Sequence, residues 1–479
     1  MKNLLLLFLC ALTTNLSAQE VVDVEVQDVQ SSFILSLILP FTPEYNLQNY
    51  KVQYTTVDAF GQPDTASGLV TIPITTDDIS FPIAVYNHGT VGGEREAVLS
   101  REGIQERFLV AAIATSGYIG LAPDYLGLGD NDGRHPYVHA KTEASAGRDM
   151  VIAVKKWMEE EAIAQFNDQL FITGYSQGGH AAAALHRDIA TNPGDDGLTV
   201  TAASHLSGPY SISEVMVGTI FQDGNATLPG YIAYTYISYD YVYSLFDSLA
   251  QAFVPPYLEP IQRFADQEIN LTVFNAELDN LLMTNGDQFN AIFQDSIREV
   301  LRSGDPTYPI NIALADNDTY DWAPEQPTLI YYCTEDEQVP FRNAILADSV
   351  MRANGSTSVV LESGGPLDHN GCVIPAILRT IQFWDQYAEV ISSLGAPVAR
   401  PDLTLSPNPT YAGGELRLSG LDVAILPFTL YDASGRIILR GVTDSAGSLR
   451  LPNHLRSGLH VLRLGMGDGT SVVRRVVVH

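Results

Sequence analysis

Positive charge is scarce in this chain of 479 residues, which holds 26 lysines and arginines against 56 aspartates and glutamates, a formal net charge of -30. An acidic surface repels phosphate groups, so nucleic acids and anionic membranes are excluded as partners. Long apolar runs are scarce too, and none reaches the ~20 residues of a membrane-spanning helix, so we expect no transmembrane segment. The glycine-rich segments lack the spacing of dinucleotide or phosphate loops. We therefore expect neither phosphoryl nor hydride transfer, and no cofactor.

The first residues of the chain are typical of a secretory signal peptide. Lys2 supplies a positive start, Leu4 to Leu12 form an apolar stretch, and Leu16-Ser17-Ala18 form a small-residue cleavage site. This pattern predicts a signal peptide over residues 1–18 and a mature N-terminus near Gln19. The protein is therefore expected to leave the cytoplasm.

The most informative motif is Gly174-Tyr175-Ser176-Gln177-Gly178. The apolar run before it predicts a strand, and the small residues after it predict a helix. This context is typical of a nucleophile elbow, where glycines leave room for a serine in a strained backbone conformation. We interpret Ser176 as the nucleophile of a serine hydrolase; a flexible turn is the alternative.

A serine nucleophile needs a base, and after this kind of elbow an acid and then a histidine follow in the chain, each on a loop after a strand. Of the ten histidines, His369 has such a place. It follows the apolar run Val359-Val360-Leu361 and precedes a segment with apolar residues at helical spacing. The other histidines lie before the serine, too close after it, or in a tail of different composition. We predict that His369 is the base.

Three adjacent acidic residues, Glu335, Asp336 and Glu337, follow the apolar run 328–333. A carboxylate in this loop would hold the imidazole of His369 in the required tautomer. A solvated turn is the alternative for each of them.

An oxyanion hole requires backbone N–H groups that converge on the developing negative charge. The N–H of Gln177, directly after the nucleophile, is one candidate. The second is expected in the loop His88-Gly89-Thr90, which follows an apolar run and resembles the oxyanion loop of lipases and esterases. Thr90 or Gly89 is the expected donor there, and a glycine-rich turn without a role is the alternative.

Beyond the elbow, the chain resembles the secretory lipase family of α/β-hydrolases over about residues 45–390. The resemblance rests on His88-Gly89-Thr90, on Ala122-Pro123-Asp124-Tyr125-Leu126-Gly127-Leu128-Gly129 and on the segment 174–179. It implies an α/β-hydrolase fold with a mostly parallel sheet, and hydrolysis of small-molecule or lipid carboxylic esters through an acyl-enzyme. The Asp-x-x-Val-Pro sequence that starts at Asp336 resembles the acid loop of many α/β-hydrolases and favours this residue.

Two alternatives to the ester hydrolase stay open. One is a serine peptidase of the prolyl oligopeptidase type, which uses the same residues on the same fold. The other is an inactive hydrolase fold that serves as a surface binding protein.

An insertion over about residues 212–322 separates two predicted core strands and is longer than a simple connection. Its helical patterns predict a cap over Ser176. The insertion is rich in tyrosine, and these side chains are expected either to line an acyl or alcohol pocket or to pack the core of the cap: Tyr231, Tyr234, Tyr236, Tyr239, Tyr241, Tyr243 and Tyr257.

Only three cysteines are present, and Cys10 lies within the predicted signal peptide. Cys333 lies three residues before Asp336, and Cys372 lies three residues after His369. A disulfide between them would join the loops that carry the acid and the base. Two small buried thiols are the alternative.

The last part of the chain differs in composition. Residues 401–479 hold eight arginines and six acidic residues, and a linker is expected at 396–402. Short apolar runs between turn residues predict a small β-sandwich over 403–479.

Ser406-Pro407-Asn408-Pro409 and the segments 431–436 and 458–461 resemble the C-terminal sorting domain of proteins exported by the bacterial type IX secretion system. The resemblance implies interaction with that machinery, export across the outer membrane, and a secreted or cell-surface protein. A carbohydrate-binding or adhesive module is the alternative.

The sequence thus predicts an α/β catalytic domain over residues 19–395 with a helical cap, followed by a small all-β domain. Two acidic loops, Asp130-Asn131-Asp132 and Asp316-Asn317-Asp318, lack a full calcium-loop signature. No metal is expected.

Overall fold

The structure is a computed structural model, and the predicted signal peptide 1–18 and linker 396–402 lie outside its described residues. It divides into two compact units, Met1–Thr75 with Phe81–Val390 and Thr76–Ser80 with Ile391–His479. The described residues are 19–76, 78–92, 97–221, 228–389, 391–392, 403–420, 426–432, 437–444, 447–465 and 471–479.

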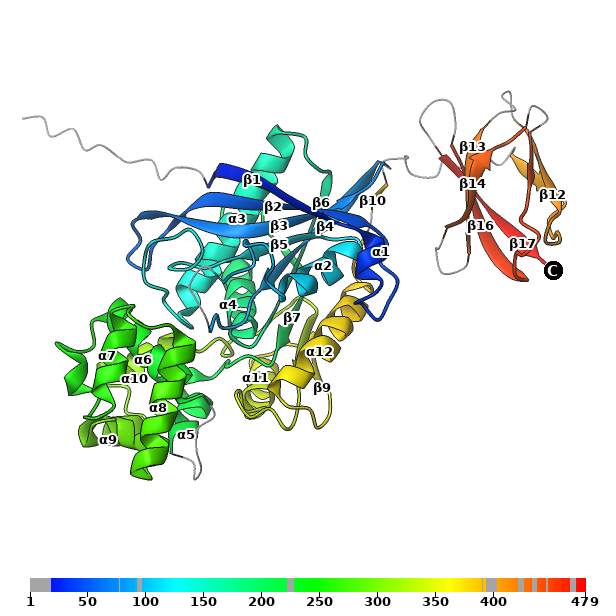
Figure 1. Cartoon of the computed structure of the whole chain (residues 1–479). Coiled ribbons are helices and arrows are strands. Elements are labelled where there is room, and N and C mark those ends of the chain that lie inside the picture. The colour runs from blue at the N-terminus through cyan, green and yellow to red at the C-terminus, as the bar shows by residue number, and fades with distance from the viewer. Residues whose placement is uncertain are drawn as a thin grey trace, which may run out of the picture. The chain divides into compact units, whose positions relative to one another are not determined.

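The larger unit is built on one sheet (Figure 1). Its strands are β1 (Val21–Gln30), β2 (Asn46–Val57), β3 (Pro63–Ile74), β4 (Ile79–Asn87), β5 (Ile119–Pro123), β6 (Phe166–Tyr175), β7 (Val200–Leu206), β8 (Thr328–Tyr332) and β9 (Val359–Ser363). They are hydrogen-bonded in the order β1-β2-β3-β5-β4-β6-β7-β8-β9. The pairs from β5 to β9 are parallel, whereas β1, β2 and β3 pair antiparallel. Strand β5 is buried along its whole length, as expected for a strand covered on both faces.

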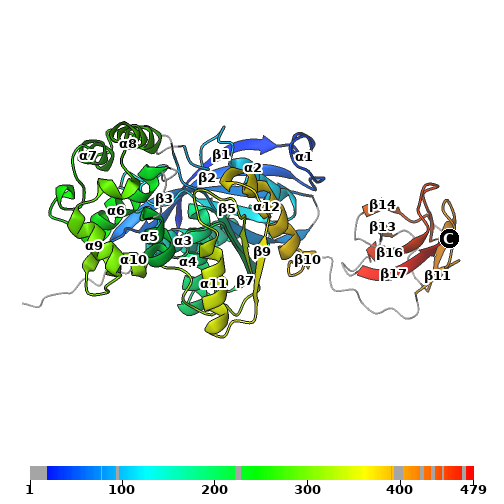
Figure 2. The same ribbon diagram turned by 90° about the horizontal axis from the view of Figure 1, so that it is seen from below.

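Helices cover both faces of this sheet. They are α1 (Ser32–Leu35), α2 (Arg107–Thr115), α3 (Ala140–Glu160), α4 (Gln177–Thr191), α11 (Arg342–Ala353) and α12 (His369–Trp384). Helices α2 and α12 lie on one face and α3, α4 and α11 on the other (Figure 2). Trp384 at the end of α12 is fully buried in the core on its side. No helix in the described part of the chain is long and apolar enough to cross a membrane.

The insertion between β7 and β8 is helical in its described residues, as predicted. Its elements are η1 (Ile212–Met216), α5 (Val217–Ile220), α6 (Pro229–Tyr243), η2 (Leu249–Gln251), α7 (Leu258–Ala265), α8 (Leu271–Asn285), η3 (Phe289–Ile292), α9 (Asp295–Ser303) and α10 (Pro309–Asp316). It has a core of its own, in which Phe253, Phe274 and Phe293 are fully buried. The insertion is therefore a packed cap and not an extended loop.

The smaller unit is all β in its described residues. Its strands are β10 (Ile391–Ser392), β11 (Thr404–Ser406), β12 (Glu415–Ser419), β13 (Pro427–Asp432), β14 (Ile437–Val442), β15 (Ser448–Arg450), β16 (Gly458–Gly465) and β17 (Ser471–Val478). Antiparallel pairing joins β11-β12-β15 in one sheet and β14-β13-β16-β17 in another. Leu416 from the first sheet and Leu430 and Leu462 from the second are fully buried in one shared core. This is the small β-sandwich that the sequence predicts.

Candidate active site

Ser176 stands at the sharp turn between β6 and α4. Its backbone has φ 61° and ψ -122°, and a positive φ is costly for a residue with a side chain. Its N–H donates a hydrogen bond to the carbonyl oxygen of Leu206, at the end of β7, over 3.1 Å. The turn therefore presents the serine at the carboxyl end of the sheet.

The glycines of the motif are required by close approach of other backbone segments. A Cβ atom on Gly174 would overlap the carbonyl oxygen of Gly178, and one on Gly178 would overlap that of Asn87 at the end of β4. A Cβ on Gly179 would meet the carbonyl oxygen of Leu206. Only glycine lets these segments approach so closely.

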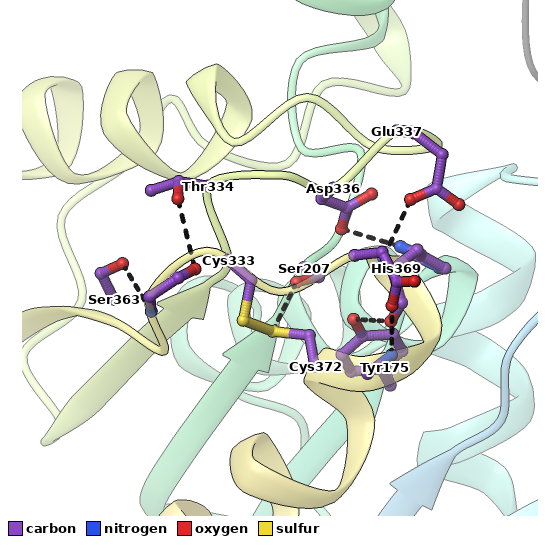
Figure 3. Close-up of a disulfide and its surroundings, with 12 residues drawn as sticks. Tyr175, Ser207, Cys333, Thr334, Asp336, Glu337, Ser363, His369 and Cys372 are labelled. Carbon is purple, nitrogen blue, oxygen red and sulfur yellow. Dashed lines mark hydrogen bonds and ion pairs between the residues drawn. A yellow bond between two sulfur atoms is a disulfide. The ribbon is translucent and has the colours of Figure 1, made fainter.

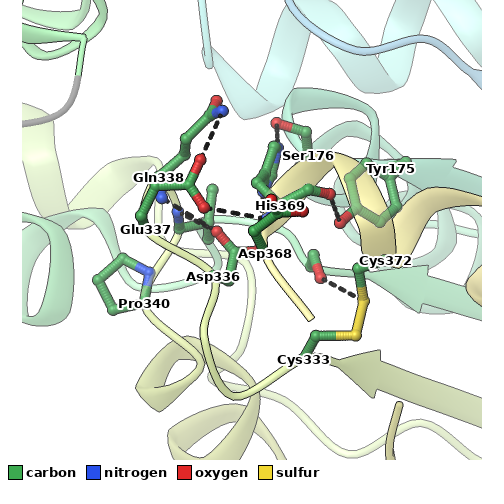
Figure 4. Close-up of polar contacts among 12 residues, drawn as sticks. Tyr175, Ser176, Cys333, Asp336, Glu337, Gln338, Pro340, Asp368, His369 and Cys372 are labelled. Carbon is green, nitrogen blue, oxygen red and sulfur yellow. Dashed lines mark hydrogen bonds and ion pairs between the residues drawn. A yellow bond between two sulfur atoms is a disulfide. The ribbon is translucent and has the colours of Figure 1, made fainter. Parts of the chain in front are cut away.

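The structure brings Ser176, His369 and Asp336 together in one chain of hydrogen bonds (Figure 4). Ser176 Oγ lies 2.9 Å from His369 Nε2, and His369 Nδ1 lies 2.7 Å from Asp336 Oδ2. The side chains of Asp336 and His369 are 1% and 6% exposed. A carboxylate oxygen accepts, so Nδ1 carries the hydrogen and Nε2 is left to accept the hydroxyl proton of the serine.

The loop after β8 distinguishes the three predicted acidic residues. Asp336 Oδ1 accepts the backbone N–H groups of Gln338 and Val339 at 3.0 and 2.8 Å, which fixes this carboxylate against the imidazole. Glu337 Oε2 accepts the backbone N–H of His369 at 3.0 Å. Glu335 is exposed.

Glu337 is a charged group at neutral pH. Partial burial raises its pKa, but the hydrogen bond from the His369 N–H and the other donors around it outweigh burial and leave the pKa lowered. Glu337 thus anchors the backbone of the histidine, while Asp336 orients its ring.

A disulfide joins Cys333, directly after β8, to Cys372 in the first turn of α12 (Figure 3). The Cα atoms lie 6.1 Å apart, and both residues are fully buried. In addition, the hydroxyl of Tyr175 donates to the carbonyl oxygen of His369 over 2.6 Å. The acid loop, the histidine and the elbow are therefore tied to one another around the site.

The two loops expected to form an oxyanion hole meet beside Ser176. The N–H of Gln177 is the first amide of α4, and the first amides of a helix have no partner within it. The N–H of Gly89 donates to Glu106 Oε1 over 3.0 Å, so this amide is engaged and our expectation for Gly89 is corrected. Thr90 remains the candidate from this loop, and its Oγ1 lies 2.9 Å from the Tyr137 hydroxyl.

Behind Gln177 lies a buried polar network that the sequence did not reveal. Gln177 Nε2 lies 3.0 Å from Glu143 Oε1 and 2.9 Å from His135 Nε2. Glu143 Oε2 lies 2.7 Å from His180 Nδ1, and His180 Nε2 lies 2.8 Å from the carbonyl oxygen of Asn317. A carbonyl oxygen only accepts, so His180 Nε2 carries a hydrogen. The network fixes the side chain of Gln177 and links α3, α4 and the end of the cap.

His135 in this network is neutral. Burial lowers its pKa to about 3, because desolvation penalises the charged imidazolium. Its Nδ1 lies 2.8 Å from the carbonyl oxygen of Leu126 and carries the hydrogen. Its Nε2 is then an acceptor for the amide of Gln177.

A cavity of about 70 Å³ opens at Ser176. Residues of the cap form most of its wall, and no lining residue is charged: Tyr137, Val138, Ser176, Gln177, Pro209, Ile212, Met216, Val217, Ile220, Leu228, Tyr231, Ile232, Thr235, Tyr236, Leu314, Gln338 and Val339. The wall of the cavity next to the serine is therefore uncharged and largely apolar.

The two acidic loops are engaged within the protein. Asp130 pairs with Lys51 and Arg101 at 2.5 and 2.6 Å. Asp318 accepts the hydroxyl of Ser213 over 2.5 Å. No group of three or more His, Cys, Asp or Glu side chains placed to hold a metal occurs among the residues that the structure describes.

Comparisons with known proteins agree on the architecture. The chain matches no protein-family model and no curated protein sequence. Among solved structures, it is similar to a protein of Legionella pneumophila described as a hydrolase, with 29% identity, a TM-score of 0.68, and 77% of this chain and 98% of that chain covered. The chain has the α/β-hydrolase fold.

Two further α/β-hydrolase structures are similar at lower identity. The rice cell wall degrading esterase LipA of Xanthomonas oryzae is 24% identical with a TM-score of 0.65, over 77% of this chain and 98% of that chain. Lipase A of Candida antarctica in its closed state is 13% identical with a TM-score of 0.54, over 78% and 84%. The predicted fold class, a mostly parallel sheet with a helical cap and an added β domain, is confirmed.

The disulfide is expected to stabilise the larger unit. We predict that Cys333→Ser/Cys372→Ser lowers its free energy of unfolding by about 2–5 kcal/mol, because the unfolded chain is no longer closed across a separation of 39 residues. Urea denaturation followed by tryptophan fluorescence measures the change. Reductant should lower the free energy of unfolding of the unaltered protein to that of the variant and should not change that of the variant. Equal free energies of unfolding of the two proteins without reductant would contradict the prediction.

Proposed function

We propose that this chain is a serine hydrolase that cleaves carboxylic esters, an esterase or lipase. The observation that carries the proposal is the hydrogen-bonded chain Ser176–His369–Asp336 at the mouth of an uncharged cavity. The solved neighbours that are called an esterase and a lipase share the fold, and this supports the same reaction type.

The geometry supports a complete reaction sequence. His369 Nε2 takes the proton of Ser176 as Oγ attacks the ester carbonyl carbon, and Asp336 stabilises the imidazolium through Nδ1–H. The tetrahedral intermediate collapses, and the alcohol leaves with the proton from Nε2. A water molecule then gives a proton to Nε2 and attacks the acyl-enzyme, which releases the acid and restores Ser176.

The negative charge of the intermediate lies on the former carbonyl oxygen. The N–H of Gln177 has no partner within its own helix and is the first donor. The backbone N–H of Thr90 is the second donor in this proposal. The contacts of Gln177 with Glu143 and His135 support it, because they hold the first turn of α4 in place before substrate binds. Such a preorganised donor has no reorganisation cost during the reaction.

Hydrolysis of p-nitrophenyl esters from acetate to palmitate tests this function. We predict that residues 19–400 hydrolyse members of the series and that Ser176→Ala lowers kcat at least about 10⁴-fold, because the nucleophile is lost. Ser145→Ala on α3 is the matched control, and its hydroxyl donates to the Thr142 carbonyl oxygen. Equal activity in Ser176→Ala, or none in the folded parent, would contradict the proposal.

We also infer that the protein is exported and that its C-terminal unit serves type IX secretion. The buried disulfide supports an oxidising compartment. The two-sheet core of the smaller unit supports a separate module with its own stability. Both agree with the signal peptide that the sequence predicts and with the resemblance of the C-terminal segment to a sorting domain.

Export is tested in a bacterium that has the type IX system. We predict that the full chain reaches the medium or the cell surface, whereas a chain that ends at residue 400 stays in the periplasm with its disulfide formed. Fractionation followed by immunoblotting measures the distribution. Equal export of both chains would contradict the role of the smaller unit.

A further inference from the structure

A second cavity, of about 340 Å³, lies in the larger unit on the other side of α6 from the serine. Ser176 is not among its lining residues, which instead include Arg134, Glu268 and Asn270. Unlike the cavity at Ser176, it therefore contains charged side chains of both signs.

Helix α6 separates the two cavities. Tyr231, Ile232, Thr235 and Tyr236 line the cavity at Ser176, and their spacing places them on one side of a helix. The second cavity is lined from the same helix by another set with helical spacing: Tyr234, Ile237, Ser238 and Tyr241. The helix is thus one wall that both cavities share.

A pair of stacked aromatic rings forms part of this wall. Tyr137 lines the cavity at Ser176 and Tyr234 lines the second cavity. The two rings are stacked, with centroids 4.4 Å apart and planes at 4°. Ring contact at this distance leaves no space for a ligand between them, so the wall here is two rings thick.

The ring pair is held in place from both sides. The hydroxyl of Tyr137 lies 2.9 Å from Thr90 Oγ1, and the ring of Tyr234 packs edge-on against Phe264 of α7 at 4.7 Å. Next to the pair, Gln177 of the first cavity contacts His135 of the second over 2.9 Å. That polar pair belongs to the network behind the elbow, and the His135 ring also packs edge-on against both tyrosines, with centroids 6.0 Å from Tyr137 and 6.2 Å from Tyr234. The stacked tyrosines are the aromatic part of this wall.

We propose that the Tyr137–Tyr234 stack sets the acyl length of the substrate, by closing the apolar cavity at Ser176 against the second cavity. The inference rests on the proposed ester hydrolase. The substrate class that follows is an ester whose uncharged acyl group fits within the cavity at the serine. Beyond the stacked rings lies the space lined by Arg134 and Glu268, which a longer acyl chain could enter only if the rings were removed.

The test compares acyl-chain profiles of variants that open or keep the wall. Tyr137→Ala/Tyr234→Ala removes both rings, and Tyr137→Phe/Tyr234→Phe is the matched control that keeps both rings and loses the contact of the Tyr137 hydroxyl with Thr90. We expect the opened variant to raise the ratio of kcat/KM for p-nitrophenyl palmitate to that for butyrate at least about tenfold. The control should keep the ratio of the unaltered protein. Tyr137→Leu/Tyr234→Leu is a milder opening, which serves if the alanine variant does not fold.

Three outcomes separate the claims. An unchanged ratio in folded opened variants that still hydrolyse butyrate would overturn the inference and leave the proposed function intact. A series of butyrate esters with increasingly large alcohols tests the alcohol side of the substrate. If the opened variant gains kcat/KM for larger alcohols but not for longer acyl chains, the inference is also overturned. If the unaltered protein hydrolyses no ester faster than its Ser176→Ala variant does, the proposed function is overturned instead.

Discussion

The backbone conformation of Ser176 is the constraint on which the rest of the site depends. A positive φ at a serine persists only where surrounding structure holds it, and here β4, β7 and the start of α4 approach the turn at glycine positions. The sheet order places β6 between β4 and β7, so the turn is enclosed from both neighbours. The same topology brings the loop after β4, with Thr90, to the serine.

The second requirement is that the base and the acid are held within hydrogen-bonding distance of this fixed serine and of each other. They come from two loops that follow the cap insertion in the chain. Because they are far from Ser176 in sequence, bringing them to the serine costs chain entropy. The disulfide, the Tyr175 hydroxyl and the carboxylate of Glu337 each join these loops to one another or to the elbow. The histidine is therefore held at its backbone as well as at its ring.

Much of this arrangement could be predicted from the sequence, because its signals are local. The glycines around Ser176, and the position of His369 after a strand, are visible along the chain, and the alternation of apolar residues predicts the β-sandwich. The prediction of Gly89 as a donor did not hold, because its N–H donates to the carboxylate of Glu106, whose position depends on tertiary packing. Glu143 carries no motif and gains its contacts only when α3 packs beside α4.

The tyrosines of the cap show the same limit. Periodicity predicts a helix over the segment, but the rotation of that helix about its axis is set by packing, so the sequence does not tell which cavity Tyr231 or Tyr234 faces. Some line a cavity, while Tyr239 is fully buried and donates to the Val138 carbonyl oxygen.

The central claim is that Ser176 is a nucleophile activated by His369, and covalent labelling with a neutral p-nitrophenyl alkylphosphonate tests it most directly. The account predicts release of one equivalent of p-nitrophenol, one adduct by intact mass, and its location on Ser176 by peptide mapping. It also predicts that His369→Ala slows labelling at least about 100-fold, because the general base is lost. An adduct on another residue, or labelling of Ser176 at the same rate without His369, would contradict the account.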